Sequence, residues 1–145
     1  MADLAGIIRL RRFQLDEKRQ ALAGWQRFAE GIRDDRARLE QSIESEKQTA
    51  LNTDDTNMVF AFGGFVQGAL ERRKRLDESL TKIEGQIETA IEDVRNAFAD
   101  LKRFEQTQAQ RQSREAARRA RVETAQLDEI GLDGYRRRSS EPGAA

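Results

Sequence analysis

Residues 66–104 read VQGALERRKRLDESLTKIEGQIETAIEDVRNAFADLKRF. Apolar residues recur in this stretch at alternating steps of three and four, and the series has only one charged member, Arg73. That spacing places the series on one face of an α-helix and is the heptad signal of a coiled coil. The series comprises Val66, Ala69, Arg73, Leu76, Leu80, Ile83, Ile87, Ala90, Val94, Ala97, Leu101 and Phe104. The stretch therefore predicts a long helix that packs against a partner helix along one seam.

The first third of the chain carries a second seam with more polar interruptions. One row of the heptad is mostly apolar and contains Ile8, Leu15, Leu22, Ala29, Arg36, Ile43 and Ala50. The other row is poorer and contains Leu4, Arg11, Lys18, Trp25, Ile32, Leu39 and Glu46. Two seams of similar length in one chain predict that the two helices pair with each other.

The run NTDDTN at residues 52–57 separates the two seams. Its side chains hydrogen-bond readily to their own backbone and so compete with helix formation. We therefore predict an all-α fold with a first helix over about 4–51, a turn over about 52–58 and a second helix over about 59–130. A short turn makes the helices antiparallel, and a paired stem of this length would be roughly 70 Å long.

The second helix is expected to extend past the first. Beyond Phe104 the seam becomes polar, with Gln108, Arg111, Glu115 and Arg118, so the helix outlasts its partner. Gly131 and Gly134 are expected to end it, because glycine commonly terminates helices. The sequence thus predicts one hairpin domain over 1–130 and a disordered tail over 131–145.

The composition argues against an enzyme and against a membrane-spanning protein. Hydrophobic residues make up 37% of the chain and charged residues 36%, with 26 basic and 26 acidic side chains, and cysteine and histidine are absent. We therefore expect no catalytic residues, no metal site and no cofactor. The longest uncharged run, residues 57–70, is too short to cross a bilayer, and no signal peptide is evident, so we expect a cytoplasmic protein without direct membrane insertion.

The two ends of the predicted rod differ in chemistry. Basic segments at residues 9–19 and 111–121 meet at the open end, which carries both termini, and leave that end positively charged. Phe60, Phe62 and Phe65 follow the turn at the other end. An exposed apolar patch of this kind usually docks a partner, although the same residues could instead pack the hairpin tip against Ile43, Ala50 and Leu51.

Other interpretations of these patterns stay open. The arginines could form only a solvated helix face with partners on their own helix. The chain could be a generic structural coiled-coil adaptor that self-associates. A nucleic-acid-binding helical protein is a further alternative. However, residues 105–121 contain no aromatic side chain that could stack on a base, and no nucleic-acid-reading module is evident. We expect no nucleic-acid partner.

The chain resembles the FliJ/YscO proteins of flagellar and virulence type III secretion systems, which are small coiled-coil hairpins similar to the stalk of rotary ATPases. Nearly the whole chain shares their layout. The resemblance is carried by residues 10–18 (LRRFQLDEK), by Phe65 and Leu70, by residues 102–105 (KRFE) and by residues 126–130 (QLDEI). The Gly63-Gly64 interruption and the abundance of arginine, 21 residues against five lysines, depart from the family pattern.

The resemblance implies a component of a flagellar-type protein export apparatus that takes part in flagellum biogenesis or virulence secretion. Its partners would be a hexameric export ATPase and a membrane export gate component, and the escort of export chaperones is also attributed to the family. It would be cytoplasmic and peripherally associated with the membrane export apparatus. The implied ring contacts are Arg9, Arg11, Arg12, Arg114, Arg118 and Arg119. The expected contacts with the export gate or another partner are Phe60, Phe62, Phe65, Ala69 and Leu76.

Overall fold

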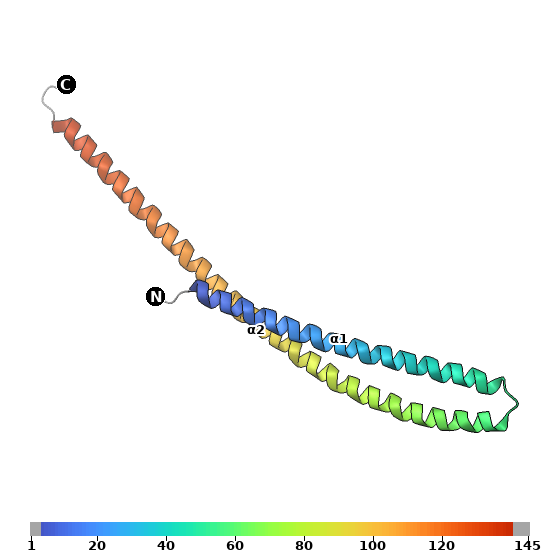
Figure 1. Ribbon diagram of the computed structural model, residues 1–145. Helices are drawn as coiled ribbons and strands as arrows, with labels where there is room; N and C mark the ends of the chain where they lie inside the picture. Colours follow the sequence, from blue (N-terminus) through green and yellow to red (C-terminus); the bar gives the residue numbers. More distant parts are fainter. Residues whose placement is uncertain (1–3, 141–145) are drawn as a thin grey trace.

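The chain folds into two long helices joined by a short turn. A computed structural model describes residues 4–140, in which α1 spans Leu4–Leu51 and α2 spans Thr56–Ser140. The helices run antiparallel, and α2 continues alone past the start of α1 (Figure 1). The predicted all-α hairpin with a longer second helix is therefore confirmed. With 48 residues in α1 and 85 in α2, the helices are about 70 and 130 Å long.

The side chains of the turn determine where the helices meet it. The Asn52 amide donates to the carbonyl oxygens of Gln48 and Thr49, which closes the last turn of α1. The Asp55 carboxylate then accepts a 2.9 Å hydrogen bond from the Asn57 amide and so caps the first turn of α2. Because of this cap, α2 begins at Thr56, earlier than the predicted residue 59, and residues 56–58 belong to the helix.

The seam predicted for residues 66–104 is the packed face of α2, since every member of the series is buried or half-buried. Two buried clusters join it to α1. The first, near the open end, contains Ile8, Leu15 and Leu101. The second, in the middle of the stem, contains Ala29, Ile32 and Ile83. On α1 the poorer heptad row is less completely packed, because Lys18, Trp25 and Glu46 are exposed.

Two of the charged seam positions, Arg36 and Arg73, form ion pairs across the hairpin. Arg36 of α1 lies 3.1 Å from Asp77, and Arg73 of α2 lies 2.8 Å from Glu40. All four side chains remain more than a third exposed, so solvent screens both pairs and their contribution to stability is small. Because each arginine has an acid from the other helix beside it, the pairs favour this register over a shifted one.

The C-terminal end of α2 differs from the prediction. The helix continues through Gly131 and Gly134 to Ser140, so the expected disorder is wrong for residues 131–140, and residues 141–145 lie outside the described residues. A glycine ends a helix when it adopts the left-handed conformation, and neither glycine has a positive φ here. Each costs only about 1 kcal/mol relative to alanine inside a helix, so the flanking residues carry the helix through.

Candidate functional site

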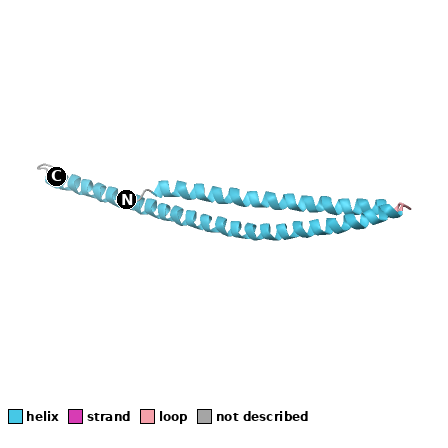
Figure 2. Ribbon diagram, turned by 60° about the horizontal axis from the view of Figure 1, so that its bottom comes forward, coloured by secondary structure: helices cyan, strands magenta, loops and turns pink. Residues whose placement is uncertain are grey.

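The unpaired part of α2 is the most distinctive surface of the molecule. We call residues 109–140 the overhang. The stem ends where Leu4 packs beside the cluster that contains Leu101, with Phe104 on its edge. In the overhang only Glu115 and Gly134 are even half-buried. Figure 2 shows this segment of α2 extending away from the stem with no helix beside it.

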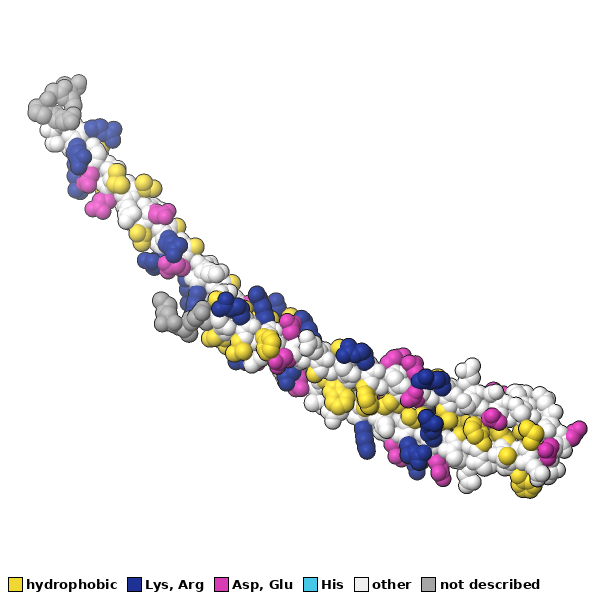
Figure 3. All heavy atoms as spheres, in the orientation of Figure 1, with side chains coloured by type: hydrophobic (Ala, Val, Ile, Leu, Met, Phe, Trp, Pro, Cys, Tyr) yellow, Lys and Arg dark blue, Asp and Glu magenta, His cyan; other side chains and the backbone are white. Residues whose placement is uncertain are grey.

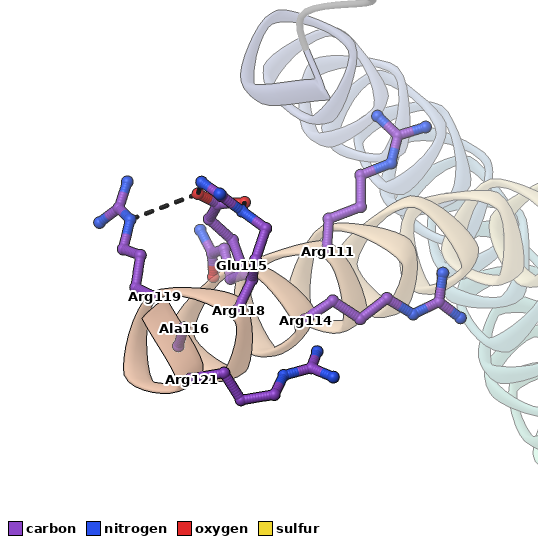
Figure 4. Close-up of a pocket in the computed structure, with 8 residues that line it drawn as sticks. Arg111, Arg114, Glu115, Ala116, Arg118, Arg119 and Arg121 are labelled. Carbon is purple, nitrogen blue, oxygen red and sulfur yellow. Dashed lines mark hydrogen bonds and ion pairs between the residues drawn. The ribbon is translucent and has the colours of Figure 1, made fainter. Parts of the chain in front are cut away.

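One face of the overhang carries a line of arginines. We call Arg111, Arg114, Arg118 and Arg121 the arginine stripe. Their spacing of three, four and three residues places them along one side of the helix. Residues 109–121 contain five arginines and one acid, Glu115, which gives a net charge of +4. The stripe lines an open surface, and its guanidinium groups extend outward from the helix (Figure 4).

Glu115 engages two of these five arginines. Its carboxylate accepts bonds of 2.7 and 3.2 Å from Arg118 and one of 3.3 Å from Arg119. The hydrogen bond from Arg118, and then the attraction of the arginine charges, lowers the pKa of Glu115 below that of an ordinary glutamate. Within residues 4–140, Arg111, Arg114 and Arg121 have no ion pair or hydrogen-bond partner from their side chains. These three can bind another molecule without first breaking an internal contact.

The lowered pKa of Glu115 can be measured directly. Because the pKa is depressed in the folded chain, its interactions with the arginines are fully present above the ordinary glutamate value of about 4.3 and are lost as the pH falls through the lowered value. We expect the titration midpoint of the Glu115 carboxyl carbon, followed by NMR, to lie below that ordinary value. Replacing Arg118 and Arg119 by glutamine should raise the midpoint. An unchanged midpoint in this variant would contradict the assigned cause.

The arginines of α1 are used mostly within the hairpin. The Arg11 guanidinium lies over the Phe104 ring at 5.4 Å from its centroid and donates a 2.9 Å hydrogen bond to Gln14. Arg12 pairs with Glu105 at 3.4 Å. Of the three ring contacts implied in α1, only Arg9 is exposed and without a side-chain partner among the described residues. Arg11 is therefore a packing residue, and Arg12 contributes to the pairing of the two helices.

The hairpin tip exposes part of the predicted apolar group. Phe60 is 77% exposed and Phe65 is 38% exposed, whereas Phe62 is half-buried. Leu51 is also largely exposed, whereas Ile43 and Ala50 are half-buried, so the tip is packed only in part. The spheres of Figure 3 show hydrophobic side chains reaching the surface at this end of the rod.

Two further residues expected to contact the export gate lie in the packed seam of the hairpin. Ala69 is only 5% exposed. Leu76 packs against the cluster of Ala29, Ile32 and Ile83. Both belong to the seam series, so an approaching protein could reach Ala69 only if the hairpin opened, whereas the half-buried Leu76 keeps part of its side chain at the surface.

The sequence interpretation did not identify an apolar group on the outer face of α1. Leu10, Phe13 and Phe28 are each more than half exposed. Leu10 and Phe28 are five helical turns apart and Phe13 is nearly in line with them, so plotting exposed positions on a helix of 3.6 residues per turn could have found the group. On α2, Phe98 is partly exposed and lies beneath the Lys102 ammonium, 5.3 Å from the ring centroid.

The acidic side chains of the chain are dispersed along its helices. Over residues 4–140, no three of them come together in a way that could hold a metal ion. Neither helix contains, within that same range, a segment both long and apolar enough to cross a bilayer. What the geometry offers is a rod with separated contact surfaces, and these are suited to binding other macromolecules.

Comparison with known proteins adds no relative, since no family model, no curated protein and no solved structure matches the chain.

Proposed function

We propose that the chain is a coiled-coil stalk of a flagellar-type protein export apparatus, in which its open end contacts a hexameric export ATPase and its tip contacts a membrane export gate component. The observation that carries the proposal is the overhang, a single exposed helix with a net charge of +4 over residues 109–121. The basic segment lies where the overhang leaves the stem, close to Arg9 at the start of α1, and can touch a ring whose loops are acidic. The resemblance to the FliJ/YscO proteins supplies the identity of the ring.

The proposed ring contact would use the arginines that have no other partner. Arg9 and Arg114 are free of internal side-chain partners among the described residues and belong to the implied set. Arg118 and Arg119 can join once Glu115 releases them, whereas Arg11 is occupied by Phe104. At the other end, Phe60 and Phe65 are the exposed candidates for the gate.

The proposal also assigns a location and a class of partner. The protein would be cytoplasmic and peripherally associated with the membrane export apparatus, and export chaperones would be further partners. Contacts that depend on exposed arginines weaken with salt, because the Debye length falls to about 8 Å at physiological ionic strength. The association with the ring should therefore be transient and salt-sensitive.

A neutralising double substitution tests the ring contact. We expect Arg9→Gln/Arg114→Gln to weaken binding to the purified export ATPase from the same source roughly tenfold, equivalent to about 1.4 kcal/mol. Glutamine keeps the helix and removes the charge, so helicity by circular dichroism should not change. Binding is measured by fluorescence anisotropy at low and at physiological salt.

The matched control is Arg72→Gln/Arg75→Gln. These arginines are exposed on α2 near the turn and have no side-chain partner among the described residues, so the control removes the same charge from the other end of the rod. It should bind the ATPase like the wild type. Equal losses in both variants would show that only total charge matters. Failure of the wild-type protein to bind the ATPase would overturn the proposed function.

A further inference from the structure

The overhang has a second patterned face besides the arginine stripe. Mostly small and apolar residues recur on it in alternating steps of four and three, the spacing of a coiled-coil seam. We call this series the overhang seam: Ala109, Ser113, Ala116, Ala120, Glu123, Leu127, Ile130 and Gly134. Leu127 is 68% exposed and Ile130 is 67% exposed. These are large apolar side chains in a regular seam, and no residue within 4–140 covers them.

The overhang seam and the arginine stripe lie on nearly opposite sides of the helix. Ala116 is two residues from both Arg114 and Arg118, which corresponds to a rotation of roughly 200° around the helix axis. A helix that packed on the overhang seam would therefore leave the arginines facing outward. The ring contact proposed above uses the other face.

Residues 109–135 of the overhang fall into two segments of opposite charge, and Arg136, Arg137 and Arg138 follow them. Residues 109–121 have a net charge of +4, from five arginines and one glutamate. Residues 122–135 contain Glu123, Asp128, Glu129 and Asp133 and no lysine or arginine, which gives −4. Because the arginine stripe faces away from the overhang seam, the charges of neighbouring helices lie farther apart than their axes, about 8–10 Å. The two segments therefore form no ion pairs in the seam, but their long-range attraction favours placing opposite charges side by side.

A second copy of the chain complements both patterns when it runs antiparallel. When two antiparallel copies are centred between residues 121 and 122, each seam residue of one copy lies opposite a seam residue of the other. The basic segment of one copy then lies beside the acidic segment of its partner. This arrangement also sets small residues against large ones, with Ala116 opposite Leu127 and Ser113 opposite Ile130. Parallel pairing would place like charges together.

We propose that two copies of this chain pair antiparallel through their overhangs, along the seam of residues 109–134. The interface is isologous, so a single two-fold axis crosses the helices near residues 121 and 122. The two hairpin stems then point in opposite directions, and all four arginines of each stripe remain on the outside of the dimer. The pairing buries Leu127 and Ile130, the two largest side chains of the overhang seam, against alanine and serine of the partner.

Disulfide trapping tests the direction and register of the pair. The chain contains no cysteine, so single-cysteine variants report only the engineered position. We expect an equimolar mixture of Ala116→Cys and Leu127→Cys to form mainly the mixed disulfide under mild oxidation. Each variant alone should cross-link poorly, because residues 116 of the two copies would be displaced by 11 positions, about 16 Å, and bridged cysteines need Cα atoms within about 7 Å.

A mixture of Ser79→Cys and Leu127→Cys measures random collision, since Ser79 is exposed on the stem of α2. Predominant disulfides within each single variant would indicate parallel pairing and overturn the proposal. Mixed cross-linking no stronger than in the Ser79 mixture would overturn it as well.

Self-association provides a second, independent measurement. The average mass of the wild-type chain in analytical ultracentrifugation should rise with concentration toward that of two chains, and the rise should be smaller in high salt. Leu127→Asp/Ile130→Asp should weaken this association at least tenfold. Binding of the same variant to the export ATPase should not change. A wild-type chain that stays monomeric at every concentration would overturn the pairing.

Discussion

Leu15→Ala is expected to lower the free energy of unfolding by about 2–5 kcal/mol, the usual range when a buried leucine is truncated to alanine. Leu15 is 3% exposed and lies in the cluster with Ile8 and Leu101, which joins the open end of α1 to α2. The two-helix stem has few buried residues, so the loss of one large side chain cannot be compensated by neighbours. Urea unfolding followed by circular dichroism at 222 nm measures the change.

The matched control is Leu10→Ala, which makes the same substitution on the same helix. Leu10 is 52% exposed, so its truncation should change the free energy of unfolding by less than about 1 kcal/mol. Similar losses at both positions would mean that Leu10 is covered in solution or that Leu15 is not packed in the hairpin. The mass of the protein in solution would distinguish these two explanations, because coverage of Leu10 by a second copy would raise it.

Ala29→Leu is the second substitution with a large expected effect, of about 1–3 kcal/mol destabilising. Ala29 is 0% exposed and packs with Ile32 and Ile83 where the two helices pair in the middle of the stem. Three added carbon atoms there must displace α2 or force neighbouring side chains from their preferred rotamers. The expected result is a lower melting temperature, measured by circular dichroism, although leucine is itself a good helix former.

Ala21→Leu serves as the control for this second prediction, because Ala21 is exposed on α1. Leucine and alanine have similar helix propensities, so the melting temperature should stay close to that of the wild type. If Ala29→Leu also left the melting temperature unchanged, the two helices would have to be further apart at Ala29 than the buried cluster indicates.

The heptad pattern predicted the helices and their packed faces well. Every member of the series from Val66 to Phe104 is buried or half-buried, and α1 ends at Leu51 as the change in composition at residue 52 indicated. These features depend on local periodicity, which a sequence displays directly. The ends of the helices were predicted less well. The cap by Asp55 and the helical conformation of Gly131 and Gly134 depend on backbone geometry, and the residue types allow other conformations as well.

The candidate contact residues were only partly predictable, because two of them belong to the seam as well as to the implied sites. Ala69 and Leu76 are at heptad positions, where Ala69 is buried and Leu76 is half-buried against the cluster of Ala29, Ile32 and Ile83. Exposure of Phe60 at the tip is consistent with the expected apolar patch, while the exposed Phe13 and Phe28 on α1 were not anticipated. A residue type identifies the chemistry available, and only its orientation determines whether a partner can reach it.

The sequence by itself determined that this protein is an antiparallel helical hairpin with a longer second helix and a basic open end, since heptad spacing and charge are properties of the chain order. Only the tertiary structure decided which arginines are engaged. Arg11 is packed on Phe104 and Arg12 is paired with Glu105, whereas Arg114 remains free of an internal side-chain partner among residues 4–140. The physical reason is that contacts between helices depend on their relative rotation and register, to within a few ångströms, and these arise only when the two seams pack together.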